Sequence, residues 1–207
     1  MSIFFHYGNW RRIIRRCPVT TVIVLINTVM FLLTIIKGGF NSITLIKLGA
    51  LYPPLVTEAH EYYRLLTATF LHGSVFHFLS NILFGIIIIS AGLEKLIGSW
   101  RFLIVYIASG ILSSIVVTLV GGNSITVGAS GSIFGVMGTF LIIIVYKTHL
   151  LTYQDQDYVK KLLLINLIFT FLGPNISIPG HLGGLLGGLI TGAIVLNVRN
   201  RDFYYRY

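Results

Sequence analysis

The chain has 207 residues, of which 55% are hydrophobic and 10% charged, and its mean hydropathy is +0.87. This composition excludes an ordinary soluble domain and indicates one domain that folds in a lipid bilayer. The formal net charge of +9 does not indicate a nucleic-acid-binding protein, because the basic residues flank apolar runs and are not gathered on one polar face. The lone cysteine, Cys17, cannot form an intrachain disulfide.

Six apolar runs follow in chain order, and each is expected to cross the membrane as a helix. A helix needs about 20 mainly apolar residues to span a hydrocarbon core of roughly 30 Å. The runs cover residues 18–36, 75–93, 102–120, 127–146, 162–172 and 176–198. The fifth run is short, carries Asn166 and stops at Gly173. The sequence therefore predicts an all-α membrane protein with a basic N-terminal segment (1–17), a six-helix membrane domain (18–198) and a tail (199–207).

Lysine and arginine predict the orientation, because the cytoplasmic loops of membrane proteins carry the excess of these residues. With the N-terminus inside, only Lys37, Lys47 and Arg64 fall on the outer side. The other basic residues fall on the cytoplasmic side: Arg11, Arg12, Arg15, Arg16, Lys95, Arg101, Lys147, Lys160, Lys161, Arg199, Arg201 and Arg206. This imbalance predicts that both termini are cytoplasmic. The many isoleucines and the short tails favour a bacterial plasma membrane.

The segment between the first two runs, residues 37–71, is the only long connection. Loops of this length are usually functional or carry structure of their own. Pro53 and Pro54 would interrupt any helix that reached them, and Glu61 and Arg64 have the i and i+3 spacing that lets two side chains pair on one helical turn. We expect an outer loop of short interfacial helices that this pair supports.

Polar side chains at membrane depth are costly, so they mark a bundle interior or a water-filled cavity. The second run carries His77 and Asn81, which at i and i+4 share one helix face. The fourth run carries Ser130 near its start, and the sixth carries His181. Because the predicted topology makes all three helices enter from the outer side, we expect these side chains at one depth, in the outer third of the membrane.

This set of side chains predicts nucleophilic acyl transfer. A serine hydroxyl is a weak nucleophile until a base takes its proton, so Ser130 is the candidate nucleophile and His181 its base. The oxyanion formed after attack needs preorganised donors, which Asn81, His77 and backbone N–H groups near Ser130 are expected to supply. Ser132, two positions further on, points to another side of the helix and is assigned to packing or to lipid.

Two rows of glycine predict that the fourth and sixth helices approach closely, because small residues let helix backbones meet in lipid. The rows lie beside Ser130 and His181 and are expected to hold these two side chains within bonding range. They comprise Gly131, Gly135 and Gly138 in the fourth helix and Gly184, Gly188 and Gly192 in the sixth.

These motifs resemble those of the rhomboid family of intramembrane proteases, in chain order from about residue 58 to residue 192. Gly128-Ala129-Ser130-Gly131 resembles the family's nucleophile motif. His77 and Asn81 fall on its HxxxN signature, and the glycine-rich stretch that follows His181 resembles the helix of its catalytic histidine.

Further positions resemble residues that support the site in this family. Tyr63-Arg64 is similar to an aromatic-arginine motif of the outer loop, with tyrosine where tryptophan is common. Glu94 and Gly98 fit a turn after the second helix. Phe134 stands where some members have a tyrosine stacked on the catalytic histidine. Gly128, Gly131 and Gly184 belong to the same supporting set.

The resemblance implies a serine endopeptidase that works with a Ser–His dyad, without metal or other cofactor. It implies cleavage of single-pass membrane proteins within or just above their transmembrane helix. Two alternatives stay open. A transporter also places polar residues in a wet cavity, but usually shows repeats and polar groups through both leaflets. A non-catalytic relative that only binds membrane segments would be expected to lack Ser130 or His181. The oligomeric state, the natural substrate and the role of His72 stay open.

Overall fold

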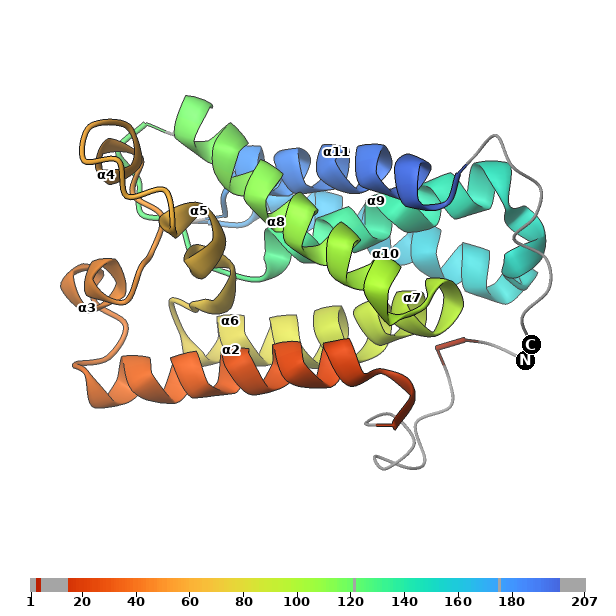
Figure 1. Cartoon of the computed structure of the whole chain (residues 1–207), viewed down its shortest axis with the longest axis horizontal. Coiled ribbons are helices and arrows are strands. Elements are labelled where there is room, and N and C mark those ends of the chain that lie inside the picture. Colours follow the sequence, from red (N-terminus) through yellow and green to blue (C-terminus); the bar gives the residue numbers. More distant parts are fainter. Residues whose placement is uncertain (1–2, 5–14, 121, 175, 198–207) are drawn as a thin grey trace.

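The computed structural model describes residues 3–4, 15–120, 122–174 and 176–197. The predicted tail and most of the predicted N-terminal segment therefore lie outside the described residues. The long helices run roughly along the longest axis of the molecule (Figure 1). In chain order they are α2 (Pro18–Ile36), a continuous second span of α6 (Val75–Ser80), η2 (Asn81–Ser90) and α7 (Ala91–Ile97), then α8 (Ser99–Val120), α9 (Ser130–Tyr146), α10 (Tyr153–Leu172) and α11 (Ile178–Val195).

Each of the six predicted runs is helical in the structure, so the prediction of an all-α bundle is confirmed. By length and apolar composition, α2, α8, α11 and the second span can cross a membrane. The apolar helix α9 has 17 residues, which is shorter than a typical span. Helix α10 has 20 residues, but its first half is polar.

Four helix starts differ from those predicted. Helix α8 begins at Ser99 and not at residue 102, and α11 begins at Ile178 and not at residue 176. Helix α9 begins at Ser130 rather than at residue 127, because Gly128 has φ +131°, a left-handed conformation that interrupts a helix. Helix α10 begins at Tyr153, well before residue 162. Thr152 and Asp155 form a capping box that starts this helix in polar sequence, where an apolar run gives no signal.

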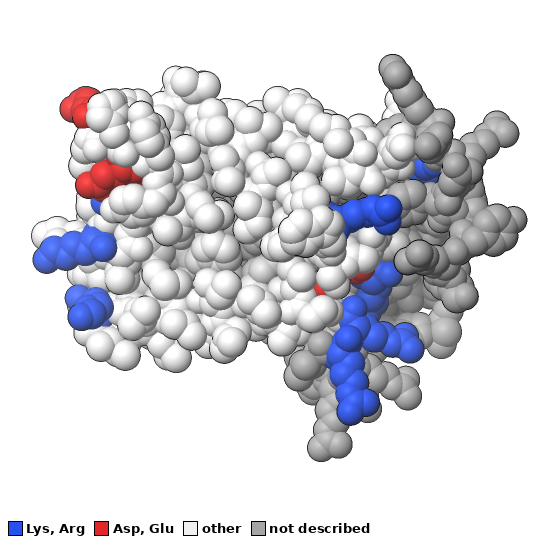
Figure 2. Space-filling model, in the orientation of Figure 1, with Lys and Arg blue, Asp and Glu red and all other residues white. Residues whose placement is uncertain are grey.

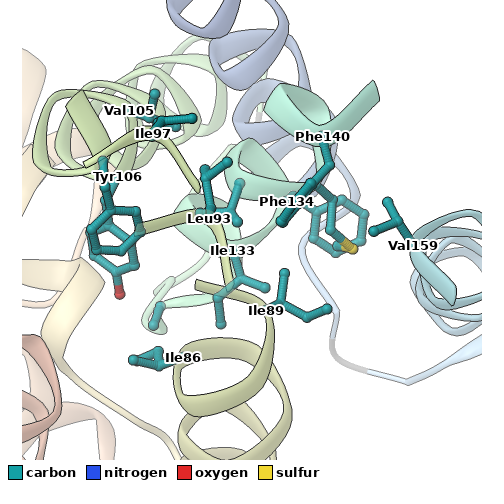
Figure 3. Packing of buried hydrophobic residues seen from close by; sticks show 14 of the residues in the cluster. Ile86, Ile89, Leu93, Ile97, Val105, Tyr106, Ile133, Phe134, Phe140 and Val159 are labelled. Atoms are coloured by element: carbon teal, nitrogen blue, oxygen red, sulfur yellow. The ribbon is translucent and has the colours of Figure 1, made fainter. Parts of the chain in front are cut away.

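Helix α9 is the central helix and packs against both α8 and α11 (Figure 1). Residues 131–140 are buried without interruption. Figure 3 shows side chains of α9 among those of the second span and α8; they include Ile133, Phe134 and Phe140 with Ile86, Ile89, Leu93, Val105 and Tyr106. This core fixes the helix whose first residue is Ser130.

The glycine rows bring the backbones of α9 and α11 into contact, as predicted. A Cβ atom on Gly184 would overlap the carbonyl of Gly131, and one on Gly188 would overlap the carbonyl of Gly135. A hydroxyl group also bridges the contact, since Thr139 Oγ1 lies 3.1 Å from the carbonyl oxygen of Gly135 in its own helix and 3.0 Å from that of Gly188 in α11. Larger residues at these positions would force the two helices apart.

Charged side chains lie at the two ends of the molecule, with a broad uncharged surface between them (Figure 2). Many apolar side chains of the described residues are exposed; Leu25, Phe84 and Phe169 are each about 60% exposed. Apolar exposure of this extent suits lipid contact and not water. The chain is therefore a multi-pass membrane protein.

Glu94 of α7 is buried and binds the start of α2. Its carboxylate accepts hydrogen bonds from the backbone N–H of Val19 at 3.0 Å and of Thr20 at 2.7 Å, and from Ser99 Oγ at 2.6 Å. A helix N-terminus has unpaired N–H groups and a positive dipole end, so it binds an anion well. This side chain, assigned a supporting role from the sequence, joins the first span to the second.

The outer loop contains the short helices α3 (Ser42–Lys47), α4 (Pro53–Thr57) and α5 (Arg64–Thr67), followed by η1 (Ala68–Phe70). Arg64 is buried and forms an ion pair with Glu61, as its spacing predicted. Its Nη1 also donates to the carbonyls of Ile46 and Ala50, at 2.7 and 2.9 Å. Three segments of the loop are thereby held together.

The loop also holds the segment that leads to Ser130. Leu51 and Thr126 exchange a pair of backbone hydrogen bonds of 3.1 and 2.9 Å. The N–H of Gly128 donates to the carbonyl of Ala68 at 3.0 Å. The approach to the candidate nucleophile is therefore fixed by residues far away in the sequence.

Candidate active site

Ser130 is the first residue of α9, with Ala129 as the residue that precedes the helix. The first N–H groups of a helix have no intrahelical acceptor and lie at its positive end. The first intrahelical bond runs from the N–H of Ile133 to the carbonyl of Ala129, which leaves the preceding amides as potential donors beside the Ser130 hydroxyl. The predicted backbone donors therefore have a structural basis in the start of α9.

Gly128 separates Ser130 from the ring of His77. A Cβ atom at Gly128 would lie 2.7 Å from both Cε1 and Nε2 of His77 and 3.7 Å from Ser130 Oγ. Contacts below 3.0 Å are not seen for real Cβ atoms, and the backbone φ also favours glycine. Glycine at this position lets the His77 ring approach the turn that carries the candidate nucleophile.

Asn81 lies where α6 continues into the π-helix η2, a conformation that is frequent at functional positions. Its side chain is buried, and its Nδ2 donates to the carbonyl of His77 at 2.8 Å. A side-chain amide has two N–H donors, so one is used within the helix and one is left. Among the described residues, Asn81 makes no hydrogen bond with Ser130.

His181 lies in the first turn of α11, where two contacts orient its ring. Phe134 of α9 stacks on the imidazole, with ring centroids 4.2 Å apart and an interplanar angle of 18°. Thr170 Oγ1 of α10 lies 2.8 Å from Nδ1. Ser113 Oγ of α8 donates to the carbonyl of Gly180, the residue before His181, at 2.7 Å. Side chains of three neighbouring helices thus fix the start of α11.

Ser130 and His181 lie at the facing starts of two helices whose backbones touch. A Cβ atom on Gly131 would be 3.6 Å from the carbonyl of Gly180, the residue before His181. The described residues include no hydrogen bond between Ser130 and His181. Catalytic hydrogen bonds are often long in empty sites and tighten when substrate binds. The dyad therefore stays a prediction.

His72 lies beside this group in the connection before α6. Its ring is fully buried, and neither nitrogen has a hydrogen-bond partner among the described residues. Its ring centroid lies 5.1 Å from that of His77, edge to face. Burial, with a smaller effect from His77, lowers the pKa of His72 to about 3. The ring is therefore uncharged at neutral pH.

Sequence reasoning missed two side chains that hold the candidate base. Thr170 and Ser113 are small hydroxyl residues in apolar helices, which are normally assigned to packing. Thr170 is one helical turn after Asn166, so a pair of polar residues at i and i+4 marked this face of α10. Ser132, by contrast, is buried against Gly110 of α8 without a hydrogen-bond partner among the described residues, in agreement with its assignment to packing.

Comparison with known proteins identifies the family. Residues 59–198 match the sequence model of the rhomboid domain. YdcA of Bacillus subtilis (strain 168), a candidate rhomboid protease, is 29% identical over 97% of this chain and 100% of its own length. Rhomboid protease GluP of the same organism is 34% identical over 84% of this chain, which covers 34% of GluP. RHOMBOID-like protein 1 of Arabidopsis thaliana is 36% identical over 76% of this chain, which covers 41% of that protein. The chain belongs to the rhomboid family.

Proposed function

We propose that this chain is an intramembrane serine endopeptidase that cleaves single-pass membrane proteins within or near their transmembrane helix. The observation that carries the proposal is the meeting of two helix starts, with Ser130 at one and an oriented His181 at the other. The family relatives named as proteases support the same conclusion.

In the proposed mechanism His181 Nε2 takes the proton of Ser130 Oγ as the oxygen attacks the carbonyl carbon of the scissile bond. The carbonyl oxygen becomes an oxyanion, which accepts hydrogen bonds from the first amides of α9, the free N–H of Asn81 and the ring of His77. His181 then gives the proton to the leaving nitrogen. Water, activated by the same imidazole, attacks the acyl carbon and releases Ser130.

We also propose a plasma-membrane location with both termini cytoplasmic, so that the proposed chemistry takes place in the outer leaflet. The end of the molecule where α2 begins and α7 ends (Figure 1), which holds Arg15, Arg16, Lys95 and Arg101, would then face the cytoplasm. A substrate helix would reach Ser130 beside the second span and α10, with its outer end unwound.

Cleavage of a reporter tests the function. The reporter carries one transmembrane helix, is reconstituted with the purified chain in liposomes, and is followed by gel electrophoresis. Ser130→Ala should remove cleavage, because the attacking oxygen is lost. Ser132→Ala is the matched control and should cleave, since its hydroxyl is buried two residues along the same helix. Undiminished cleavage by Ser130→Ala would refute the proposal, and a native chain that binds the reporter without cutting it would favour the non-catalytic alternative.

Asn81→Ala should lower turnover by up to roughly 10²- to 10³-fold, the cost of removing one oxyanion donor. The Michaelis constant should change little, because the oxyanion exists only after attack. Asn27→Ala in α2 is the matched control: it removes an Asn side chain with the same hydrogen bond to its own helix, 2.7 Å to the carbonyl of Ile23. If Asn81→Ala turns over like the control, Asn81 does not serve the oxyanion.

A further inference from the structure

The imidazole of His181 has one polar side-chain partner among the described residues, and this partner is Thr170. The hydroxyl oxygen of Thr170 lies 2.8 Å from His181 Nδ1. Thr170 is buried in the last turn of α10, with a relative exposure of 1%. The contact therefore joins α10 to the candidate base through a hydroxyl group that is itself buried.

A second bond of Thr170 decides the direction of the first. Thr170 Oγ1 also lies 2.7 Å from the carbonyl oxygen of Asn166, one helical turn earlier. A carbonyl only accepts, and a hydroxyl has a single proton. If that proton is donated to the Asn166 carbonyl, Thr170 Oγ1 must accept its hydrogen bond from Nδ1–H of His181.

We propose that Thr170 is a positioning residue that keeps the proton of neutral His181 on Nδ1. This inference rests on the proposed function of Ser130 and His181. With the proton on Nδ1, the lone pair of Nε2 is free to accept the proton of Ser130 Oγ. The opposite tautomer would present an N–H to the serine, and could not act as its base.

The same chain of hydrogen bonds serves the protonated ring. When His181 has taken the proton of Ser130, both of its nitrogens are donors. Nδ1–H then still donates to Thr170 Oγ1, and Thr170 still donates to the Asn166 carbonyl, so neither group has to turn. A neutral hydroxyl thus does the orienting work that a carboxylate does in a Ser–His–Asp triad.

Phe134 and Thr170 have complementary roles. The stacked ring of Phe134 fixes the plane of the imidazole, with an interplanar angle of 18°. Stacking alone does not distinguish one nitrogen from the other. Thr170 makes this distinction, because it lies at the Nδ1 edge of the ring.

Turnover of the reporter tests the proposal with two substitutions. Thr170→Val keeps the shape of the side chain and removes the hydroxyl; kcat should fall roughly 10- to 100-fold, the range for losing a hydrogen bond to a charged group, with little change in KM. Thr170→Ser restores the hydroxyl and should recover most of the native kcat. The control is Thr28→Val in α2, which removes a hydroxyl whose one hydrogen-bond partner among the described residues is in its own helix, the carbonyl of Val24 at 2.8 Å.

The nitrogen spectrum of the histidine rings gives a readout that a merely structural role would not change. The chain is labelled with ¹⁵N in its histidine rings, and the His181 signals are identified by their absence in His181→Asn. In the native chain Nδ1 should carry the proton, and in Thr170→Val this preference should be lost. Thermal unfolding in detergent, compared with Thr28→Val, separates a loss of fold from a change of tautomer.

The outcomes separate the two proposals. If the native chain cleaves, Ser130→Ala does not, and Thr170→Val keeps both native kcat and the native tautomer, the role of Thr170 is refuted and the proposed function stands. If the native chain does not cleave at all, the proposed function fails, and the nitrogen spectrum still decides whether Thr170 sets the tautomer. A Thr170→Ser variant as slow as Thr170→Val would also overturn the proposal.

Discussion

Ser130→Ala and His181→Ala should both lose reaction with a fluorophosphonate probe, whereas the native chain in detergent is labelled. The probe phosphonylates an activated serine oxygen with loss of fluoride, so Ser130→Ala lacks the oxygen that is labelled. In His181→Ala the hydroxyl is present but no base takes its proton. We expect labelling at least on the order of 10³-fold slower, as in serine proteases that lose their histidine.

Controls separate activation of the serine from general damage. Ser132→Ala and His149→Ala change the same residue types at a buried packing position and at an exposed position in the turn after α9, and both should be labelled at the native rate. Gel fluorescence after timed exposure measures the rates, and thermal unfolding checks that each variant is folded. Labelling of Ser130→Ala at the native rate would mean that another serine reacts.

The helices could be predicted from the sequence because the thickness of the lipid bilayer sets the length of each membrane-spanning run. A span of about 20 apolar residues is visible without knowledge of packing, and this criterion found five of the helices close to their true extent. It missed the polar first half of α10, although Thr152 and Asp155 form a capping-box pattern that can be recognised in a sequence. A search for apolar runs alone does not detect the part of a helix that is polar in sequence.

The sequence predicted those residues of the candidate site that can be recognised from their own side-chain chemistry. Ser130, His181, His77 and Asn81 stood out because polar side chains are expensive in a membrane. Thr170 did not, because threonine often bonds its own helix in apolar surroundings. Its contact with His181 depends on how α10 packs against α11 after the turn that connects them. No local pattern in the sequence encodes this packing.

The start of α9 was also beyond prediction, for a related reason. Ser130 stands at the first position only because Gly128 adopts a positive φ and is held by Ala68 of the outer loop. Both facts come from tertiary contacts. They matter for the proposed function, since an earlier helix start would bond the Ser130 amide within the helix and remove it as a donor.

Gly188→Ala should be the most damaging single-methyl change in the membrane domain. Its Cβ would overlap the backbone carbonyl of Gly135, and a backbone atom cannot rotate away as a side chain can. Overpacking of this kind costs about 1–3 kcal/mol or more, so the midpoint of thermal unfolding in detergent should fall. Any molecules that fold must do so with α11 displaced from α9. Because a shift of about 1 Å at a catalytic group can cost on the order of 10²-fold in rate, reporter cleavage should fall at least that far even below the unfolding temperature.

Gly73→Ala is the control, since its Cβ would meet only Val127 at 3.7 Å. Its unfolding midpoint and its rate of reporter cleavage should equal those of the native chain. A Gly188→Ala variant with native stability and native cleavage would show that α9 and α11 accept a methyl group between their backbones, and the predicted close approach of Ser130 and His181 would lose its support.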